Sequence, residues 1–534
     1  MGALIRRGTA GDAAQWVNLL KDVLGEDCPC KQAYDPAWIA GQLDPGFGHE
    51  TWVAAEGDRL LASVSLLTPA PSNGNPIVNL GRNLNRPESY ADGSAKALLS
   101  VVNELAEQRA CSVVGRVLAS DNAQQVLFEN LGYVCAGFQP YKHLLRKWEG
   151  VLFYVRLGKS ESEARYPLTT VPSQLRELGM VVLNQLDLAP PQAVNDGIVG
   201  YPLQTDLRIR EADYRELLAC RQQAQASNPS VEISTGYNPG CGLLRIASEK
   251  PPRAVLGMRA GRVAGGMAYL FDDQDRCVRI LDSFSTSDLA AGALCRHVLE
   301  VAQTELNAVY LEVDVLLTAS RLLKSAEQLG FVPAAYLPAF CLRNEQCVDV
   351  AKMVKLNLVY SLENVTLTAR ARQLVEVVDH NFQDQKVGVA IINLLRGLQI
   401  FAGLGDGELR KIARLFTQRL FRPGEVVFER GDAGNEAFVV MRGKVGIFLD
   451  DQSDPVGTVT NGQVFGEQAF LDGAARVARA VASEASILLI VQRAAYNELV
   501  QREPHLGMTV MRNTAIDLSN KLRRSNALLT AAKR

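Results

Sequence analysis

The stretch Phe465-Gly-Glu-Gln-Ala-Phe-Leu-Asp-Gly-Ala-Ala-Arg476 carries the most specific pattern in this chain. It places one carboxylate, Glu467, and one guanidinium, Arg476, on either side of a turn made of small residues. An arginine stays charged and matches the oxygens of a phosphate, and the backbone N–H groups of a tight turn also attract anions. A carboxylate accepts hydrogen bonds from sugar hydroxyls. The segment therefore predicts a pocket for an anionic sugar phosphate.

Short β-rich runs precede this segment. Turn chemistry in residues 421–435 separates them, and residues 437–448 predict two strands joined at Arg442-Gly443. With these motifs in this order, residues 397–505 resemble the cyclic nucleotide-binding domain of bacterial catabolite activator proteins, protein kinase regulatory subunits and gated channels. The resemblance implies a β-roll fold that binds cAMP or another cyclic nucleotide as an effector.

The resemblance also assigns roles to residues of the opening stretch. It implies that Gly466 and Glu467 bind the ribose, that Arg476 binds the cyclic phosphate, and that Ala469 is the small residue that lets the loop close. The nucleotide-binding residues implied in this way are Phe465, Gly466, Glu467, Gln468, Ala469, Arg476 and Val477.

Three residues depart from the family pattern. Ala475 stands where the family usually has proline, and Gln468 replaces a usual aliphatic residue. Val477 has no hydroxyl for a guanine contact, which favours cAMP over cGMP. The alternative is a degenerate β-roll that binds nothing, but a buried arginine and glutamate without a ligand would cost several kcal/mol.

Composition limits the other functions. The chain has 534 residues, 47% of them hydrophobic, which predicts three or four domains. A net charge of −2 argues against nucleic acid as the main partner. No apolar run reaches the roughly 18 residues of a membrane span, and the first residues lack a signal core, so we expect a cytoplasmic protein. The ten cysteines and five histidines show no metal-ligand spacing, and no metal site is predicted.

An internal repeat is the second strong signal. Leu131-Gly-Tyr-Val-Cys-Ala-Gly-Phe-Gln-Pro140 aligns without gaps on Leu329-Gly-Phe-Val-Pro-Ala-Ala-Tyr-Leu-Pro338, an offset of 198 residues, which indicates two copies of one domain. We predict an α/β (α+β) multidomain protein. Its predicted parts are domain 1 at 1–157, a linker with a helix at 158–205, domain 2 at 206–356, a helical connector at 357–396, the nucleotide-binding domain at 397–505 and a C-terminal helix at 506–534.

The order of elements in each copy resembles the GNAT-type acyltransferase fold. The segment Asn122-Ala-Gln-Gln-Val-Leu-Phe-Glu-Asn-Leu-Gly-Tyr133 is similar to a family motif, and Tyr90-Ala-Asp-Gly-Ser-Ala95 stands where the family binds the acyl-CoA pyrophosphate at a helix N-terminus. The implied acyl-CoA-binding residues are Tyr90, Ala91, Asp92, Gly93, Ser94, Ala95 and Asn122. In the alternative, Gly93 only caps a core helix.

Catalysis is less well marked than binding. The family's tyrosine acid is replaced by Phe128, and no catalytic residue is predicted. In the second copy, Gly292 aligns with Gly93, but Leu289 and Leu294 fill the outer motif positions and Ser320 replaces Asn122. We expect this second cofactor loop to be altered. Asp282, at the end of a strand, has two possible roles, a base or a solvated carboxylate, and we expect the second.

Two hypotheses of function remain open. In the first, a cytoplasmic acyltransferase moves an acyl group from acetyl-CoA or another acyl-CoA to an amine, either a protein lysine or a small molecule, under the control of a cyclic nucleotide. In the second, a non-catalytic nucleotide-responsive sensor or scaffold uses both GNAT-like copies as binding modules. Neither requires a nucleic acid or a membrane as partner.

The C-terminal helix generates a prediction about assembly. Met511, Ala515, Leu518, Leu522, Ser525 and Leu529 recur at heptad spacing, which predicts either a homodimer seam or a helix lying on its own domain. If the seam joins two chains, Leu518→Glu with Leu522→Glu converts a dimer to a monomer, because charges then face their symmetry mates. Light scattering measures the oligomeric state, and an unmutated chain that is a monomer would contradict the intermolecular seam.

Overall fold

The computed structural model describes residues 3–26, 28, 30–43, 49–67, 77–109, 112–145, 147–227, 232–233, 244, 251–343, 346–358, 360, 362, 364–386, 388–449 and 454–532. The chain forms two compact units, Met1–Phe382 and Gln383–Arg534. The boundary between them falls inside the segment 357–396 that was predicted as a helical connector. Among the described residues, no helix is long and apolar enough to cross a membrane.

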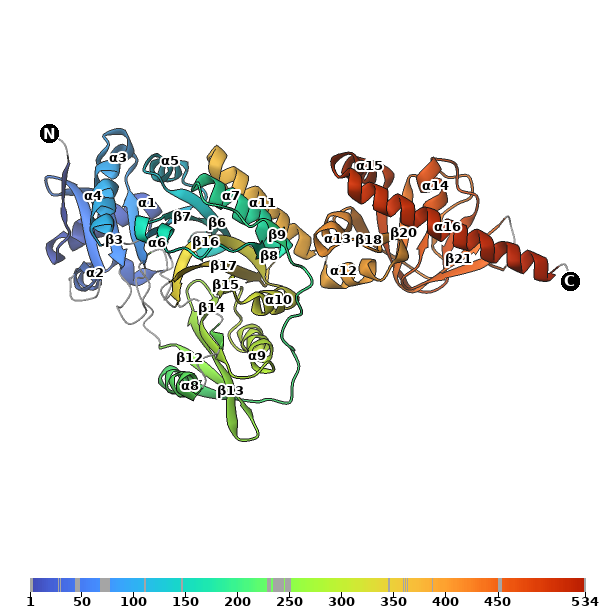
Figure 1. Cartoon of the computed structure of the whole chain (residues 1–534). Helices are drawn as coiled ribbons and strands as arrows, with labels where there is room; N and C mark the ends of the chain where they lie inside the picture. The colour runs from blue at the N-terminus through green and yellow to red at the C-terminus, as the bar shows by residue number, and fades with distance from the viewer. Residues whose placement is uncertain are drawn as a thin grey trace. The chain divides into compact units, whose positions relative to one another are not determined.

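One sheet runs through the whole first unit (Figure 1). The strands of its first half, here the first repeat, are β1 (Leu4–Arg7), β2 (His49–Glu56), β3 (Arg59–Leu67), β4 (Ile77–Asn85), β5 (Ser112–Leu118), β6 (Val134–Leu144) and β7 (Trp148–Arg156). Those of the second repeat are β10 (Arg208–Asp213), β12 (Arg253–Arg259), β13 (Arg262–Asp272), β14 (Cys277–Ser285), β15 (Tyr310–Leu316), β16 (Val332–Arg343) and β17 (Gln346–Leu356). A short strand, β11 (Glu232–Ile233), pairs with β14.

The strand order shows the internal repeat directly. It is β1-β2-β3-β4-β5-β7-β6-β16-β17-β15-β14-β13-β12-β10, so the second repeat has the order of the first in reverse. The helices of the first repeat are α1 (Ala13–Leu24), α2 (Pro36–Leu43), α3 (Pro87–Ala91), α4 (Ser94–Gln108) and α5 (Asn122–Asn130), with short 3-10 turns at Ala10–Asp12 and Lys31–Tyr34. Those of the second are α8 (Tyr214–Ser227), α9 (Ala290–Thr304) and α10 (Ser320–Gln328).

Each repeat is followed by a helix that packs on the other repeat. The linker contains α6 (Lys159–Glu163), β8 (Thr170–Val171), α7 (Ser173–Gln185) and β9 (Ala193–Val194), and α11 (Ala369–Lys386) follows the second repeat. In α7, Gly179 lies against the ring of Tyr336 on β16, where an added Cβ would come within 2.9 Å of the ring. The apolar face of α7, with Leu175, Leu178 and Val182, is buried in the same core.

Two parallel strands separate in each repeat. Strand β4 pairs with β5 from Ile77 opposite Ser112 to Leu80 opposite Gly115, and β14 pairs with β15 only as far as Ile280 opposite Val313. Because parallel strands end at the same edge of a sheet, the helices that follow them begin side by side there. In the first repeat these starts are the loop before α4 and the first turn of α5.

The two repeats meet at one close backbone contact. Strand β6 pairs antiparallel with β16 through Gly137 and Ala335, which occupy equivalent positions 198 residues apart. Antiparallel pairing of equivalent residues defines a local two-fold axis. A Cβ on Gly137 would lie 2.1 Å from the Cβ of Ala335, so only one of the two residues can carry a side chain.

A buried ion network also crosses this junction. Glu312 on β15 accepts hydrogen bonds from Gln139 (2.6 Å) and Lys142 (2.9 Å) on β6, and it pairs with Arg279 on β14. Burial by itself would raise the pKa of Glu312, but Lys142, Lys352 and Arg279 hold that pKa well below its usual range. The network therefore adds directional polar contacts to the apolar junction.

Two expectations for the second repeat are wrong. The counterpart of Gly93 is Leu289, not Gly292, because Gly93 and Leu289 immediately precede α4 and α9, and the short helix α3 lengthens only the first of these loops. Asp282 is not solvated: it is 2% exposed and bonded to Arg221 of α8, and burial raises its pKa above the ordinary value.

The second unit is a β-roll flanked by helices. It contains α12 (Gly388–Arg396), a 3-10 turn η5 (Gln399–Phe401), α13 (Asp406–Ala413), β18 (Phe416–Phe421), β19 (Val426–Phe428), β20 (Glu436–Arg442), β21 (Lys444–Phe448), β22 (Gly457–Thr460), β23 (Val464–Phe465), α14 (Glu467–Asp472), β24 (Arg479–Ala482), β25 (Ser486–Gln492), α15 (Arg493–Arg502) and α16 (Pro504–Ala532). Its two four-stranded sheets have the orders β18-β25-β20-β23 and β19-β24-β21-β22.

The core of the roll explains the sequence pattern. Four strands contribute to this core, and its buried residues include Phe421, Phe438, Val440, Val445 and Leu488. The predicted hairpin at 437–448 is formed by β20 and β21, and Gly443 turns the chain between them at a φ of 107°. That conformation favours glycine, and a Cβ there would also strike Ser486.

The junction between the repeats can be tested by moving one methyl group. Gly137→Ala should destabilise the chain by about 1–3 kcal/mol, because the added Cβ overlaps that of Ala335. The double change Gly137→Ala with Ala335→Gly should restore most of the loss, since one side chain again fills the contact. Urea unfolding measures both. Gly41→Ala, where a Cβ meets open space, is the control, and equal stability of all four proteins would show that the contact is not tight.

Candidate functional site

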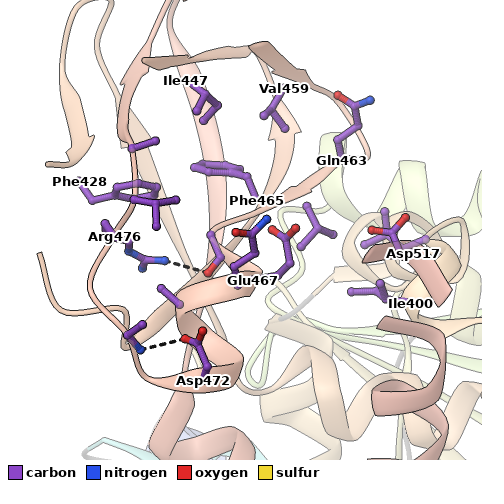
Figure 2. Close-up of a pocket in the computed structure, with 18 of the residues that line it drawn as sticks. Ile400, Phe428, Ile447, Val459, Gln463, Phe465, Glu467, Asp472, Arg476 and Asp517 are labelled. Atoms are coloured by element: carbon purple, nitrogen blue, oxygen red, sulfur yellow. Dashed lines mark hydrogen bonds between the residues drawn. The ribbon is translucent and has the colours of Figure 1, made fainter. Parts of the chain in front are cut away.

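The second unit contains a large pocket beside the start of α14 (Figure 2). Its volume is about 860 Å³, within the usual range for small-molecule sites. All the residues that the sequence predicted for the nucleotide site line it: Phe465, Gly466, Glu467, Gln468, Ala469, Arg476 and Val477. Folding thus brings Glu467 at the start of α14 and Arg476, in the segment leading to β24, to the same cavity.

Arg476 is the main charged group of the pocket. Its side chain is 4% exposed and donates hydrogen bonds to the carbonyl oxygens of Gly466 (2.8 Å) and Glu436 (2.6 Å). The guanidinium lies 4.3 Å from the centre of the Phe428 ring, and its Nε is buried without a hydrogen-bond partner among the described residues. Burial lowers the pKa of Arg476 below its ordinary value, although Glu436, Asp432 and Glu467 offset part of this effect. A desolvated cation of this kind is stabilised by an incoming anion.

Small residues hold the loop close to the arginine. Gly466 has a φ of 75°, and a Cβ there would lie 2.8 Å from Nη1 of Arg476. Gly434 approaches Ala469 so closely that an added Cβ would come within 2.2 Å of the alanine Cβ. A side chain at Gly466 would therefore displace the guanidinium, and a larger residue at position 469 would push against the loop at Gly434.

The opposite side of the pocket comes from distant parts of the chain. Leu398, Gln399 and Ile400, in and beside η5, line it together with Asp517 and Asn520 of α16. Figure 2 shows Arg476 and Asp517 on opposite sides of the cavity, with Glu467 between them. These residues, and Phe428, were not among those predicted from the sequence. No local motif marks them, because their place in the pocket depends on how α16 and η5 pack.

The acyl-CoA residues predicted in the first repeat also come together, at the edge where β4 and β5 separate. Gly93 precedes α4 with a φ of 80°, Ala95 is buried, and Asn122 is the first residue of α5. Tyr90 donates a hydrogen bond to Asp121, which caps α5 by accepting from the N–H of Gln124. The exposed residue Ala91 and its neighbour Asp92 complete the loop.

The charge around this loop is partly unfavourable to an anion. The carboxylate of Asp92 accepts the N–H of Ser94 at 2.8 Å, so one backbone donor of the loop is already bonded. Burial raises the pKa of Asp121, and burial together with this carboxylate raises the pKa of Tyr90 far above its ordinary value. A Cβ at Gly93, in contrast, would meet no atom within 4 Å, so the space in front of the helix is open.

In the second repeat the linker packs on the first turn of α9, the helix equivalent to α4. The carbonyl oxygens of Tyr201 and Pro202 lie against Gly292 in the first turn of α9, where a Cβ would be 2.9 and 2.6 Å from them. The N–H of Tyr201 bonds Ser325 on α10, and the guanidinium of Arg321 lies 4.2 Å from its ring centre. Tyr201 is 3% exposed, so the chain itself covers the first turn of α9.

No metal centre accompanies either site in the part of the chain that the structure describes. There, no group of three or more histidine, cysteine, aspartate or glutamate side chains could hold a metal ion.

Comparison with known proteins agrees with the pocket geometry. Residues 418–503 match the family model of the cyclic nucleotide-binding domain. The cyclic AMP receptor protein of Thermus thermophilus is 33% identical over 135 residues, which are 25% of this chain and 61% of that protein. The cGMP-dependent protein kinase 2 of Homo sapiens is 26% identical over 113 residues, 20% of this chain and 15% of that protein. The crystal structure of the Thermus thermophilus catabolite activator protein has 31% identity, covers 25% of this chain and 63% of that chain, and has a TM-score of 0.23.

These matches cover less than two thirds of each of these relatives. The β-roll, with its buried arginine and small-residue loop, is a regulatory module of the nucleotide-binding class. Residues 418–503 of this chain form a cyclic nucleotide-binding domain.

The role of Arg476 can be tested on the full chain. Arg476→Ala should weaken cAMP binding by about 2–4 kcal/mol, because a charge-assisted bidentate contact is lost. The cAMP affinity of Arg476→Lys should lie between those of the unmutated chain and Arg476→Ala, since lysine keeps the charge but not the planar fork. Calorimetry measures the affinities, with the exposed Arg479→Ala as control. Unchanged affinity in Arg476→Ala would remove this residue from the phosphate site.

Proposed function

We propose that the protein is a cyclic nucleotide-regulated N-acyltransferase, with the nucleotide bound in the β-roll and the acyl-CoA in the first repeat. The observation that carries the acyl-CoA assignment is the edge at which β4 and β5 separate. Gly93 and Asn122 lie there at adjacent helix starts, in the element order of GNAT-type acyltransferases. A helix N-terminus beside open space suits a pyrophosphate.

The residues of the first repeat fit this ligand better than those of the second. The open space at Gly93 allows the close backbone approach that a diphosphate needs, whereas in the second repeat Tyr201 and Pro202 pack on the first turn of α9, the helix equivalent to α4. Ala95 and Asn122 would complete the site. The N–H of Ser94 would be available to the ligand only if Asp92 released it. We therefore assign one acyl-CoA site to each chain.

The reaction class follows from the ligand. A bound acyl-CoA supplies an activated thioester. An amine nitrogen of a protein lysine or a small molecule forms the new bond to the acyl carbon while the carbon–sulfur bond breaks. The amine loses its proton to water, and CoA leaves as a thiolate that takes up a proton from water to become the thiol. The chain contributes mainly binding and orientation, which can account for a large part of the rate.

One observation favours the second candidate, a sensor or scaffold without catalysis. Phe128 takes the place of the family's tyrosine acid and is fully buried, with its ring 4.7 Å from that of Tyr133 and 5.5 Å from that of Tyr154. It packs against Gly115 on β5, where an added Cβ would lie 2.2 Å from the ring. A phenylalanine in this position offers no proton to a leaving thiolate.

We assign cAMP as the effector. Val477 lines the pocket without a hydroxyl for guanine, and Asp517 and Asn520 offer polar acceptors near the far wall for the amino group of adenine.

We also assign the C-terminal helix to a contact between two copies of this chain. Met508, Met511 and Leu522 of α16 are at least half exposed and lie at or beside the heptad spacing of the predicted seam.

The first test is whether the first repeat binds acetyl-CoA. Gly93→Ala should reduce acetyl-CoA affinity about tenfold or more, because its Cβ enters the space that the diphosphate needs. Gly132→Ala is a matched control: Gly132 has the same φ of 80° and equally open surroundings, so both variants carry the same backbone strain. Calorimetry gives the affinities, and an amine acylation assay on the unmutated chain separates enzyme from scaffold. If the unmutated chain binds no acetyl-CoA at millimolar concentration, the acyl-CoA assignment fails.

A further inference from the structure

The segment that leads into α11 is clamped to α5 of the first repeat. The side chain of Gln125 on α5 is completely buried and bonds the connector backbone twice. Its Nε2 donates to the carbonyl of Thr366 at 2.9 Å, and its Oε1 accepts the N–H of Thr368 at 3.1 Å. The N–H of Thr366 also donates to the carbonyl of Ala119, just before α5, at 2.8 Å. These bonds join residues that are about 240 positions apart in sequence, and they act together.

Thr368 ties the start of α11 to the same helix. Its hydroxyl donates to Glu129 at 2.5 Å and accepts the N–H of Ala371 at 3.1 Å, while its carbonyl accepts the N–H of Arg372. It therefore caps α11 and contacts α5 at once. Tyr154 donates to the same oxygen of Glu129 at 3.0 Å and holds this carboxylate in place.

The rest of α11 is anchored in the first unit and then leaves it. Ala371, Leu374, Val375 and Val378 are buried in its core, and Phe382 stacks on Tyr360 with ring centres 4.8 Å apart. The helix continues to Lys386, beyond the last residue of that unit, and α12 of the nucleotide-binding unit follows in the chain. A displacement of the whole helix would therefore move Thr368, at its start, against Gln125 and Glu129.

The other end of α5 belongs to the proposed acyl-CoA site. Asp121 and Asn122 begin the helix, and Asp121 accepts a hydrogen bond from Tyr90 of the loop. Gln125 lies one turn further on, and its N–H donates to the carbonyl of Asp121. A helix transmits a rigid displacement over so short a distance, about 1.5 Å of rise per residue.

The second repeat lacks the same connection. The position equivalent to Gln125 is Leu323, which is buried, and Glu327 accepts from Gln174 of α7 in place of a threonine. The chain that follows α7 leads to Tyr201, whereas the chain that follows α11 enters the nucleotide-binding unit. Helices α5 and α10, which are equivalent in the two repeats, are therefore bonded to different segments of the chain.

We propose that cyclic nucleotide regulates the acyl-CoA site of the first repeat through this clamp, with Gln125 and Thr368 as the positioning residues that couple α11 to α5. The inference rests on the proposed function. Nucleotide binding shifts α11, α5 follows, and the loop from Tyr90 to Ala95 changes its fit to the acyl-CoA. Linkage requires the converse as well, so acyl-CoA changes nucleotide affinity by the same factor.

The coupling is measured as the ratio of acetyl-CoA dissociation constants with and without saturating cAMP, by calorimetry on the full chain. The unmutated protein should show a ratio of about fivefold or more, the usual range for coupled sites. Gln125→Leu, which introduces the residue that the second repeat already has, should bring this ratio close to one while each ligand alone still binds. Thr368→Val should also lower this ratio. Gln174→Leu, at the corresponding contact of the second repeat, should leave the ratio unchanged.

Hydrogen exchange separates a failure of this inference from a failure of the proposed function. If no acetyl-CoA binds, the acyl-CoA assignment fails, but exchange in α5 with and without cAMP still reports the coupling. cAMP should change the exchange of residues 122–130 in the unmutated chain and not in Gln125→Leu. Unchanged exchange in the unmutated chain, or a coupling ratio that survives both Gln125→Leu and Thr368→Val, overturns the clamp.

Discussion

The contact between Gly137 and Ala335 is the constraint on which the first unit depends. It joins two seven-stranded repeats into one sheet, and because the two residues are equivalent in the repeat, the local two-fold axis passes between them. Backbones can pair this closely only where a side chain is missing on one side. The buried network around Glu312 then fixes the junction with directional bonds from Gln139 and Lys142. The sheet is continuous across the junction, and the two strand pairs that separate, β4–β5 and β14–β15, lie on opposite sides of the junction.

From this symmetric centre the two repeats diverge. In both, the helix that follows the repeat crosses to the other repeat: α7 lies on β16, and the start of α11 is bonded to α5. Beyond these helices the chain follows a different course after each repeat. The linker returns to pack on the second repeat with Tyr201, while α11 leads to the cyclic nucleotide-binding domain. In the second repeat the linker covers the first turn of α9, whereas in the first repeat α5 is bonded to the connector and a Cβ at Gly93 would meet no atom within 4 Å.

The nucleotide site shows how a buried cation is kept ready for an anion. Arg476 is desolvated by Phe428 and Phe438 and bonded to two carbonyl oxygens, which hold its orientation but do not neutralise its charge. The loop can approach it because Gly466 takes a left-handed conformation. An anion with two oxygens facing the guanidinium relieves the desolvation cost, so the site gains most from a phosphate. The far wall, made by α16 and η5, is the part whose fit depends on helix packing rather than on this loop.

The sequence by itself determined the features that are local in the chain. Glu467, the small-residue turn and Arg476 lie within twelve residues, and the hairpins and helix starts carry their own turn and capping residues, so the β-roll and the repeat could be predicted. Only the tertiary structure decided the contacts between distant segments. Asp517 reaches the pocket because α16 packs across it, Asp282 is buried because Arg221 comes from another helix, and Leu289 rather than Gly292 corresponds to Gly93 because α3 lengthens one loop. Such partners meet only after the sheets and helices have packed, and no local pattern of residues encodes which surfaces those elements will share.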